Sequence, residues 1–398
     1  MAVACAMLRG GVRGRLLVAV AVVGLVMSAG CNASNTGEAF DDDVAAELDA
    51  VVERGLDQTA AGGLVVRVDA PAGQRTMAAG PAAVDGEEEL TDDEAFRIAS
   101  ITKLVTATVA LQLAEEGVVD LDAPVADLIP DEAAAFEHGE QMTLRQLLGH
   151  TAGLPRSFEP GFLAETWELN SVEDGEVAAS CAAVADLDPL DHIGEDALFA
   201  PGTDWAYSDV GYDLAGAVIE AATDEPLEAA YRSRILEPLR MEETWLDCSE
   251  ESRGELAAGI HPPDIDFLPV EADEPLDVTH AALARVSGAA GGLVSTAEDL
   301  TVFARALFGG ELFDDSATLD AMLEPGPNRR YGLGVELVGD VVGHGGGLIG
   351  YNTHLSYDRQ RDIVVVVFNN GTAPPGANPA GRVATEVLSV VARVDQDG

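Results

Sequence analysis

The sequence predicts an α/β fold of the α+β type, in which helices flank an antiparallel sheet and an all-helical lobe is inserted. Three observations support this prediction. Segments of strand character occur near both ends of the chain, segments of helical periodicity fill the middle, and 47% of the residues are apolar. A chain of 398 residues with this composition can bury a large core, as one large domain or as two lobes.

The N-terminal part is predicted to supply a helix, two strands and a second helix. Residues 43–59 carry acidic side chains in their first turn, which helix N-termini favour. The segments 63–70 and 74–80 have strand character and are joined by a Pro/Gly turn. Residues 100–116 are apolar at helical spacing and are followed by Gly117, a common helix terminator.

Strand character returns in the C-terminal part. Residues 331–338, 351–357 and 362–370 are predicted strands, and 379–394 is a predicted final helix. Because strands stand at both ends and helices between them, we expect the two ends to build one sheet together.

These elements define the expected domain organisation. One domain, 43–396, would combine a sheet lobe, formed by 43–98 and 289–396, with a helical lobe, formed by 99–288. The residues 32–42 would be a polar linker in front of it. The sequence contains no internal repeats.

The charge of the chain is strongly acidic. It holds 70 Asp and Glu against 22 Lys and Arg, for a net charge of −48, and the acidic residues are spread along the chain. Such a surface keeps a protein soluble in high salt, which suggests a halophilic host. Nucleic acid is excluded as a partner, because phosphate binding needs a basic patch.

The first 31 residues (1–31) are predicted to be a signal peptide. Arginines precede the apolar run 16–27, which is too short to span a bilayer comfortably. The end of the leader resembles a bacterial lipoprotein cleavage site, in which Cys31 would become the lipidated first residue. Ser28 departs from that pattern, because leucine is usual there; the alternative is a soluble secreted protein. The protein is therefore expected to be exported and to meet a membrane only through a lipid anchor.

Two cysteines outside the leader form an even pair. In an oxidising compartment Cys181 and Cys248 are a possible disulfide, and two buried free thiols fit the sequence equally well. The chain has no C-x-x-C and no Cys/His cluster, and its histidines lack metal-ligand spacing. We therefore predict no metal site and no cofactor.

One short motif carries a chemical argument. Lys103 is the only lysine in the chain, and Ser100 stands three residues before it. If Ser100 opens the predicted helix, the two side chains share one face, and the helix dipole favours an alkoxide at Ser100. Lysine can accept the serine proton when burial lowers its pKa, whereas arginine stays protonated. An N-cap serine and a surface lysine would explain the pair without chemistry.

Two further motifs strengthen this argument. Tyr207, Ser208 and Asp209 stand in a predicted loop before a helix, and the segment H-G-G-G at 344–347 follows a predicted strand. Each is weak alone, because a buried tyrosine and a glycine turn are the simpler interpretations. In this order the three motifs resemble S-x-x-K, Y-x-N or Y-S-x, and K/H-x-G of the serine β-lactamase and penicillin-binding protein family.

The resemblance is closest to the branch of class C β-lactamases, DD-peptidases and esterases. Segments such as MTLRQLLGHTAGLP and GHGGGLIGYNTHLSYDRQRDIVVVVFNN also look like family segments, and the likeness extends over residues 43–394. It implies a β-lactamase/transpeptidase-like fold and a cofactor-free serine hydrolase.

The resemblance implies a role for each polar residue of the motifs. Ser100 would be the acylated nucleophile. Lys103 would take or relay its proton, and Tyr207 would be the partner base that later protonates the leaving group. Whether Lys103 or Tyr207 is the working base stays open. His344 would meet a substrate carboxylate or steady Tyr207.

The resemblance also implies how the substrate is held. The backbone N–H groups of Ser100 and Gly347 would form the oxyanion hole. Further substrate contacts would come from Asp209, Gly345 and Gly346. Two departures argue against an efficient β-lactamase: Asp209 replaces the usual asparagine and would repel an anion, and His344 replaces a lysine and is mostly uncharged at neutral pH.

Two other patterns are given structural interpretations. Residues 345–350 satisfy G-x-G-x-x-G, but the following residues alternate like a strand, where dinucleotide binding needs a helix. His150 is expected to be a hydrogen-bonded core histidine and not a catalytic base.

The sequence thus predicts an exported serine hydrolase that acts through an acyl-enzyme on Ser100. The favoured activity is that of a D-alanyl-D-alanine carboxypeptidase-like, penicillin-binding peptidase. The alternatives are a small-ester or amide hydrolase and a weak class C-type β-lactamase, and, from another class, a non-catalytic binding or sensor protein. The partner is a small-molecule or peptide substrate.

Overall fold

The computed structural model describes most of the chain beyond its leader. The described residues are 39–397 except for 60, 87, 157–164, 185–195, 266–272 and 375. The predicted signal peptide and Cys31 lie outside them. Among the helices of the described part, none has both the length and the apolar character that crossing a bilayer requires.

A six-stranded antiparallel sheet is built from both ends of the chain, as predicted. Its strand order is β10-β11-β12-β13-β1-β2. The strands are β1 (Leu64–Ala70), β2 (Gly73–Ala79), β10 (Glu336–Val338), β11 (Val341–Leu348), β12 (Tyr351–Asp358) and β13 (Ile363–Asn369). The N-terminal hairpin joins the C-terminal strands through β1 and β13, with Val66 opposite Val367.

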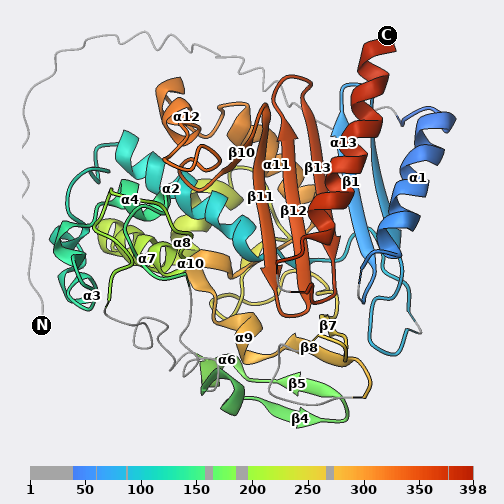
Figure 1. The fold of residues 1–398 in the computed structure, drawn as a ribbon, viewed down its shortest axis with the longest axis horizontal. Helices are drawn as coiled ribbons and strands as arrows, with labels where there is room; N and C mark the ends of the chain where they lie inside the picture. The colour runs from blue at the N-terminus through green and yellow to red at the C-terminus, as the bar shows by residue number, and fades with distance from the viewer. Residues whose placement is uncertain are drawn as a thin grey trace, which may run out of the picture. The chain divides into compact units, whose positions relative to one another are not determined.

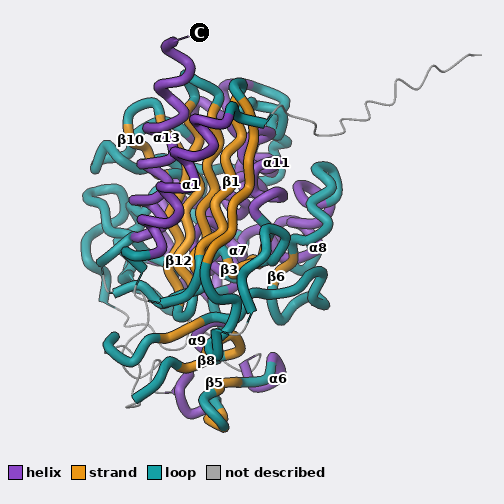
Figure 2. The backbone as a smooth tube through the Cα atoms, turned by 90° about the vertical axis from the view of Figure 1, so that its right-hand side faces the viewer, coloured by secondary structure: helices purple, strands orange, loops and turns teal. Residues whose placement is uncertain are grey.

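Two helices cover one face of this sheet. They are α1 (Asp42–Leu56) and α13 (Pro379–Asp397), and both lie in front of the strands in Figure 2. Asp41 caps α1 by accepting the N–H of Val44, so the helix begins at the end of the predicted linker. The opposite face packs against α11 (Ala297–Phe308) and the inserted segment (Figure 1).

The inserted segment is organised around one buried helix. Almost every residue of α2 (Thr102–Glu115) is buried, and α2 packs against α7 (Val210–Thr223), α8 (Leu227–Tyr231) and α10 (Gly288–Gly291). The remaining helices and helical turns of the described chain are η1 (Ala99–Ile101), η2 (Val125–Asp127), α3 (Pro130–Ala133), η3 (Gly139–Gln141), α4 (Leu144–Leu148), α6 (Cys181–Val184), η5 (Arg232–Leu236), α9 (Ala282–Arg285) and α12 (Ser316–Met322).

Two small sheets place strands within residues 99–288, which we predicted to be an all-helical lobe; two of their strands, β3 and β9, lie just outside that range. One small sheet has the order β3-β9-β6 and another β4-β5-β8-β7. Their strands are β3 (Phe96–Arg97), β4 (Ser171–Glu173), β5 (Glu176–Ala178), β6 (Trp245–Leu246), β7 (Ile260–His261), β8 (Leu276–His280) and β9 (Leu293–Ser295). These strands are two to five residues long, too short to produce a periodic signal. The fold class itself is confirmed, while the lobe boundaries stay a prediction.

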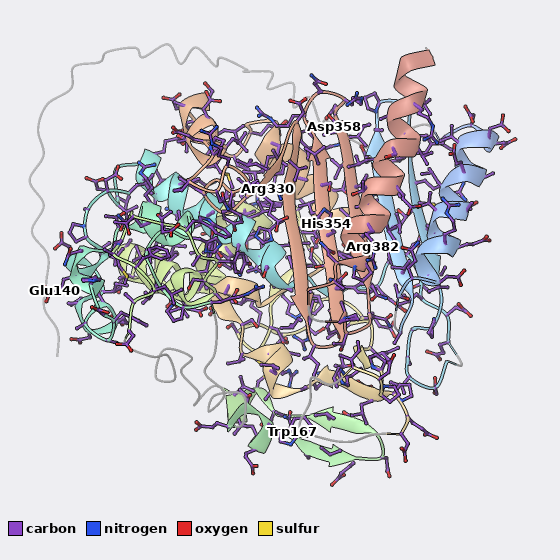
Figure 3. All side chains as sticks on the ribbon, viewed as in Figure 1. Glu140, Trp167, Arg330, His354, Asp358 and Arg382 are labelled. Carbon is purple, nitrogen blue, oxygen red and sulfur yellow. A yellow bond between two sulfur atoms is a disulfide. The ribbon has the colours of Figure 1, made fainter. Side chains whose placement is uncertain are left out.

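The four-stranded sheet packs against one end of the main sheet. Ile349, in the turn between β11 and β12, shares an apolar cluster with Val177 and Val278 of the small sheet. A disulfide between Cys181 and Cys248 ties α6 to the segment after β6, so the bridged alternative is the one observed. In Figure 3, Trp167 beside this small sheet and Asp358 lie at opposite ends of the main sheet.

Candidate active site

Ser100 lies in the short turn η1, one step before α2, and not at the first position of that helix. The preceding residue, Ala99, has a φ of 48°, a left-handed conformation that costs a non-glycine residue energy. The turn is held against strand β12 by the hydrogen bond from Thr353 Oγ1 to the carbonyl of Ile98, at 2.9 Å. The nucleophile predicted from sequence therefore sits on a fixed turn between the sheet and the inserted lobe.

The approach of β11 to this turn requires a glycine. A Cβ atom at Gly346 would lie 2.2 Å from Thr353 Oγ1 and 2.4 Å from the carbonyl oxygen of Ile98. Any side chain would therefore push the strand and η1 apart. This is a physical reason for the glycine at the middle of the H-G-G-G segment.

Lys103 is enclosed by three hydrogen-bond acceptors. Its Nζ lies 3.2 Å from Ser100 Oγ, 2.7 Å from Asp209 Oδ1 and 2.6 Å from the carbonyl oxygen of Ala290. The side chain is 0% exposed. An ammonium group has three protons to donate, so the three acceptors fully satisfy the protonated form.

The environment of Lys103 corrects one expectation. Burial by itself lowers the pKa of Lys103, but the charge of Asp209, and Tyr207 beside it, outweigh burial and raise the pKa above the ordinary value. The lysine at rest is therefore an ammonium ion, not the neutral base that burial alone would produce. The correction arises because sequence did not indicate that Asp209 pairs with Lys103.

Tyr207 stacks beside the same ammonium group. Lys103 Nζ lies 5.1 Å from the centroid of the Tyr207 ring. Burial raises the pKa of Tyr207, whereas the charge of Lys103 and hydrogen bonding to Ser100 and Lys103 oppose that rise. The structure thus brings the three residues of the first two motifs together, with Tyr207 as a neutral phenol at rest.

His344 is a buried, neutral histidine within strand β11, and it does not follow the strand as we expected. Its Nδ1 lies 2.6 Å from the carbonyl oxygen of Gly345, which can only accept, so Nδ1 carries the proton. Its Nε2 then accepts from Tyr331 Oη at 2.9 Å. Burial and the charge of Lys103 lower the pKa of His344 to about 3.

These contacts contradict one of the two roles expected for His344. Both ring nitrogens are satisfied within the protein, and the residue is 1% exposed. The ring therefore has neither the charge nor the access to bind a substrate carboxylate. Its ring centroid lies 6.2 Å from that of Tyr207, which leaves the second expected role, steadying Tyr207, compatible with the structure.

Gly347 faces open space, unlike its neighbour Gly346. A Cβ atom at Gly347 would meet nothing within 4 Å. Strand β10 pairs with β11 only at 341–343, so the outer edge of β11 beyond that point has no partner strand among the described residues. A substrate carbonyl could reach the Gly347 N–H there; the oxyanion-hole role of Gly347 and Ser100 stays a prediction.

Asp209 lies at the N-terminus of α7 and serves the lysine. Its side chain is 24% exposed and forms the ion pair with Lys103. Asp209 is therefore first a partner of Lys103, although we had placed it among the substrate contacts. His150 is the core histidine that we predicted: it is 2% exposed, and its Nδ1 accepts the N–H of Ser208 at 3.1 Å.

Sequence reasoning missed several residues of the site. Tyr331 was assigned to a strand, and the Ala290 carbonyl and Arg156 were not identified. Arg156 Cζ lies 5.4 Å from the centroid of the Tyr207 ring. A Tyr followed by Gly after the turn at 326–330 was the available signal for Tyr331, but nothing local signals a backbone acceptor such as Ala290.

The described residues contain one close group of potential metal ligands, formed by Cys181, Asp247 and Cys248. Both cysteines are in the disulfide, so they offer no thiolate to a metal. No residue set in the described part thus suits a metal near Ser100.

The chain is similar to several known proteins. The family model named Beta-lactamase matches residues 48–388. The chain is similar to an esterase, EstB, from Burkholderia gladioli, with 33% identity over 53% of each chain. It is also similar to penicillin-binding protein 4 of Amycolatopsis lactamdurans, with 30% identity over 54% of this chain and 51% of that protein. The matches thus span about half the length of these two relatives.

A solved structure is similar over nearly the whole chain. It is the D-amino acid amidase of Ochrobactrum anthropi SV3 complexed with L-phenylalanine amide, at 25% identity. The match covers 89% of this chain and 100% of the amidase, with a TM-score of 0.72.

Proposed function

The chain belongs to the beta-lactamase family of serine hydrolases, and we propose that it is an exported enzyme that acts through an acyl-enzyme on Ser100. One observation carries the proposal: a single buried ammonium, Lys103, joins Ser100 Oγ to Asp209 Oδ1, beside the ring of Tyr207. This arrangement can hold a serine hydroxyl and stabilise the charge that forms when it loses its proton.

The proposed reaction is an acyl transfer in two halves. Ser100 Oγ attacks the substrate carbonyl carbon, and its proton passes to the Lys103–Tyr207 pair. The tetrahedral oxyanion accepts hydrogen bonds from the backbone N–H groups of Ser100 and Gly347. The intermediate collapses when the bond to the leaving group breaks, and the leaving group takes a proton from Tyr207. Water then attacks the acyl-enzyme, releasing the acid and restoring the Ser100 hydroxyl.

The protonation states of the pair govern the first step. Lys103 and Tyr207 both have raised pKa values, so both are protonated at neutral pH. The form that accepts the serine proton must have lost one proton from the pair, and that loss belongs to the pair and not to either residue. Burial raises the pKa of Tyr207, and the charge of Lys103 opposes that rise. This favours a phenolate, stabilised by the ammonium, as the working base.

For the substrate we propose a D-alanyl-D-alanine-type peptide, cleaved in a carboxypeptidase-like reaction. Two comparisons support this class: one relative is a penicillin-binding protein, and the similar structure is an amidase for D-amino acids. A β-lactam would acylate Ser100 slowly, because the anionic Asp209 takes the place of an amide donor. If the resulting acyl-enzyme is hydrolysed, the protein would act as a weak β-lactamase.

A small-ester hydrolase is the second candidate. The similarity to the esterase EstB favours it. The neutrality of His344 also favours it, because the third motif then lacks the positive charge that a lysine would supply at this position. A non-catalytic binding protein is disfavoured, because such a protein would have no use for a buried lysine beside a serine hydroxyl.

The proposed location is outside the cytoplasm, with Cys31 lipidated and anchored to the outer face of the membrane. This part of the proposal depends on the sequence of the leader alone. Radiolabelled palmitate incorporated by the expressing bacterium should label the wild-type protein and not Cys31→Ser. Equal release of the two proteins into the medium would contradict the anchor.

The catalytic proposal is tested by mass spectrometry of the intact protein after incubation with a fluorophosphonate probe and, separately, with penicillin. We expect one adduct from each, and neither with Ser100→Ala. A fluorophosphonate adduct without a penicillin adduct would favour the esterase, unless nitrocefin is hydrolysed, which would indicate the β-lactamase. No adduct on folded protein would contradict the hydrolase assignment and favour a binding protein.

A further inference from the structure

Arg156 is an exposed cation beside the proton-transfer residue. Its guanidinium carbon lies 5.4 Å from the centroid of the Tyr207 ring, and its side chain is exposed to solvent. The family motifs do not include this position. Its contact with Tyr207 therefore needs an explanation outside those motifs.

The backbone of Arg156 is tied to the second motif. The N–H of Asp209 donates to the carbonyl of Arg156 at 2.9 Å, and Ser208 Oγ donates to the carbonyl of Pro155 at 2.6 Å. These two hydrogen bonds fix the segment that carries the guanidinium relative to Tyr207. The exposed guanidinium thus extends from a fixed segment beside the Tyr207 ring.

The other basic groups in contact with the Tyr207 ring, Lys103, His150 and His344, are buried. Two cations are described in contact with the Tyr207 ring, Lys103 and Arg156. Lys103 is 0% exposed and is paired with Asp209. His344, the residue expected to meet a carboxylate, is 1% exposed, and both of its ring nitrogens are bonded. A substrate anion that approaches this side of the site would therefore meet Arg156.

The charge of the whole chain makes a local cation useful for an anionic substrate. The net charge is −48, and Asp209, which is 24% exposed, lies close by. Both repel an anion, and repulsion by Asp209 is strongest at the site itself. A guanidinium fixed beside Tyr207 offsets this repulsion locally and offers two parallel N–H donors to a carboxylate.

We propose that Arg156 binds the carboxylate of the leaving group, so that this enzyme selects substrates whose scissile bond is followed by an anionic residue. The inference rests on the proposed function, in which Tyr207 protonates the leaving group. A leaving group that takes its proton from Tyr207 must approach that residue, and Arg156 is an exposed cation in contact with the Tyr207 ring. The substrate class is then a peptide with a free C-terminal carboxylate, in preference to a neutral ester or amide.

The test measures binding, so that it does not depend on turnover. Ser100→Ala protein is titrated by calorimetry, at one salt concentration, with N-acetyl-D-alanyl-D-alanine and with its C-terminal amide. We expect the acid to bind more tightly than the amide. Arg156→Gln, added to the same background, should weaken binding of the acid on the order of tenfold and remove the preference. Arg156→Lys should keep part of it, because the charge remains and the planar fork is lost.

The matched control is Arg359→Gln. Arg359 is exposed and follows Asp358, at the end of β12 that is remote from the β11–β12 turn near Gly347 (Figure 3). It should leave the preference for the acid unchanged, whereas added salt should reduce it, because an exposed pair is screened.

Equal affinity for acid and amide, absence of binding by either, or a preference that survives Arg156→Gln would overturn the assignment of Arg156. The hydrolase proposal is judged separately, by Ser100-dependent labelling with the fluorophosphonate. A labelled protein without a carboxylate preference would contradict only the role of Arg156. An unlabelled protein that prefers the acid would contradict only the hydrolase.

Discussion

The two faces of the main sheet are built on different rules. The face toward α1 and α13 is aliphatic where β1 meets β13, with residues such as Leu48, Val66, Val367 and Val387 in one cluster, and polar on β12, where Asn352 accepts the N–H of Ala380. The face toward η1 and α2 places polar groups among its apolar ones, including Thr353 and the buried ring of His344. Both faces are buried, so burial alone does not distinguish structure from chemistry here.

The difference teaches where substitutions should act. On the aliphatic face any apolar group of similar volume keeps the packing, so stability is the quantity at risk. On the other face the polar groups must be held at fixed positions and in fixed protonation states. A buried ion pair such as Lys103–Asp209 adds little net stability, because burying the charges is costly. Activity is the quantity at risk there. The predictions below test this division.

The largest effect is expected for Lys103→Arg. The substitution keeps the positive charge, but a guanidinium is larger, cannot give up its proton and does not fit three acceptors placed around one nitrogen. Hydrolysis of p-nitrophenyl acetate should fall by about 10²–10⁴-fold, the usual contribution of a positioned acid–base group.

Circular dichroism should show that the Lys103→Arg protein is folded, since the division assigns this residue to chemistry. Robust activity in that variant would remove the argument that lysine is needed at this position. An unfolded variant would show that the face toward η1 and α2 also contributes to stability.

The opposite result is expected for Leu48→Ala on the aliphatic face. Leu48 is 0% exposed and packs within the cluster between α1, α13 and the sheet. Its truncation should lower the free energy of unfolding by about 2–5 kcal/mol. The activity per folded molecule should match that of the wild type, as measured by fluorophosphonate labelling at a temperature where the variant is folded. Reduced labelling there would mean that the two faces are coupled.

Two glycines offer a matched pair for sharpening the comparison. A Cβ at Gly55 would lie 2.6 Å from Val383 Cγ2 on the aliphatic face, and one at Gly346 would lie 2.4 Å from the Ile98 carbonyl oxygen beside η1. Gly55→Ala should cost about 1–3 kcal/mol of stability through overpacking. Gly346→Ala should displace Ser100 and lower kcat/KM on the order of 10²-fold, because small misplacements are costly in catalysis.

Thermal unfolding and kcat/KM measured on both glycine variants decide the outcome. Equal losses of activity in the two would contradict the division between the faces. Gly254→Ala is the control, because its Cβ would meet nothing closer than 3.8 Å.

The last prediction concerns the dependence of the rate on pH. Both Lys103 and Tyr207 have pKa values above their ordinary values, so the form with one proton fewer is a minority at pH 7. That form becomes more populated as pH rises, so fluorophosphonate inactivation should accelerate, up to about tenfold per pH unit, between about pH 6 and 9. His344, with a pKa of about 3, should contribute no acid limb in this range. A plateau from pH 6 upward would contradict the ammonium at rest.

Residues that are close in sequence were predictable, and residues brought together by tertiary contacts were not. Ser100 and Lys103 are three apart, so their pairing follows from local geometry, and Tyr207 was located by its motif. Their electrostatics were not predictable, because the direction of the shift in the Lys103 pKa depends on Asp209, 106 residues away in sequence. Local spacing therefore gave the participants, and tertiary contacts decided their protonation.

The same reasoning explains the errors in secondary structure. The sheet shared by both chain ends was predictable, because runs such as 362–370 have strong strand character. The H-G-G-G segment was predicted to follow a strand, whereas it lies within β11 (Val341–Leu348), because glycines weaken the strand signal. The strands β4 and β5 have three residues each, fewer than a periodic pattern needs.

The joining of β1 to β13 has a consequence for the order in which the chain can fold. The N–H of Gly63 is bonded to Asn370 across 307 residues of chain. The middle of the sheet can therefore form only after nearly the whole chain has been synthesised, and contacts of such long range make folding slow. Until then the edge of β1 that pairs with β13 has no partner strand. Slow closure suits a chain that crosses a membrane before it folds, and it is compatible with the export that we propose.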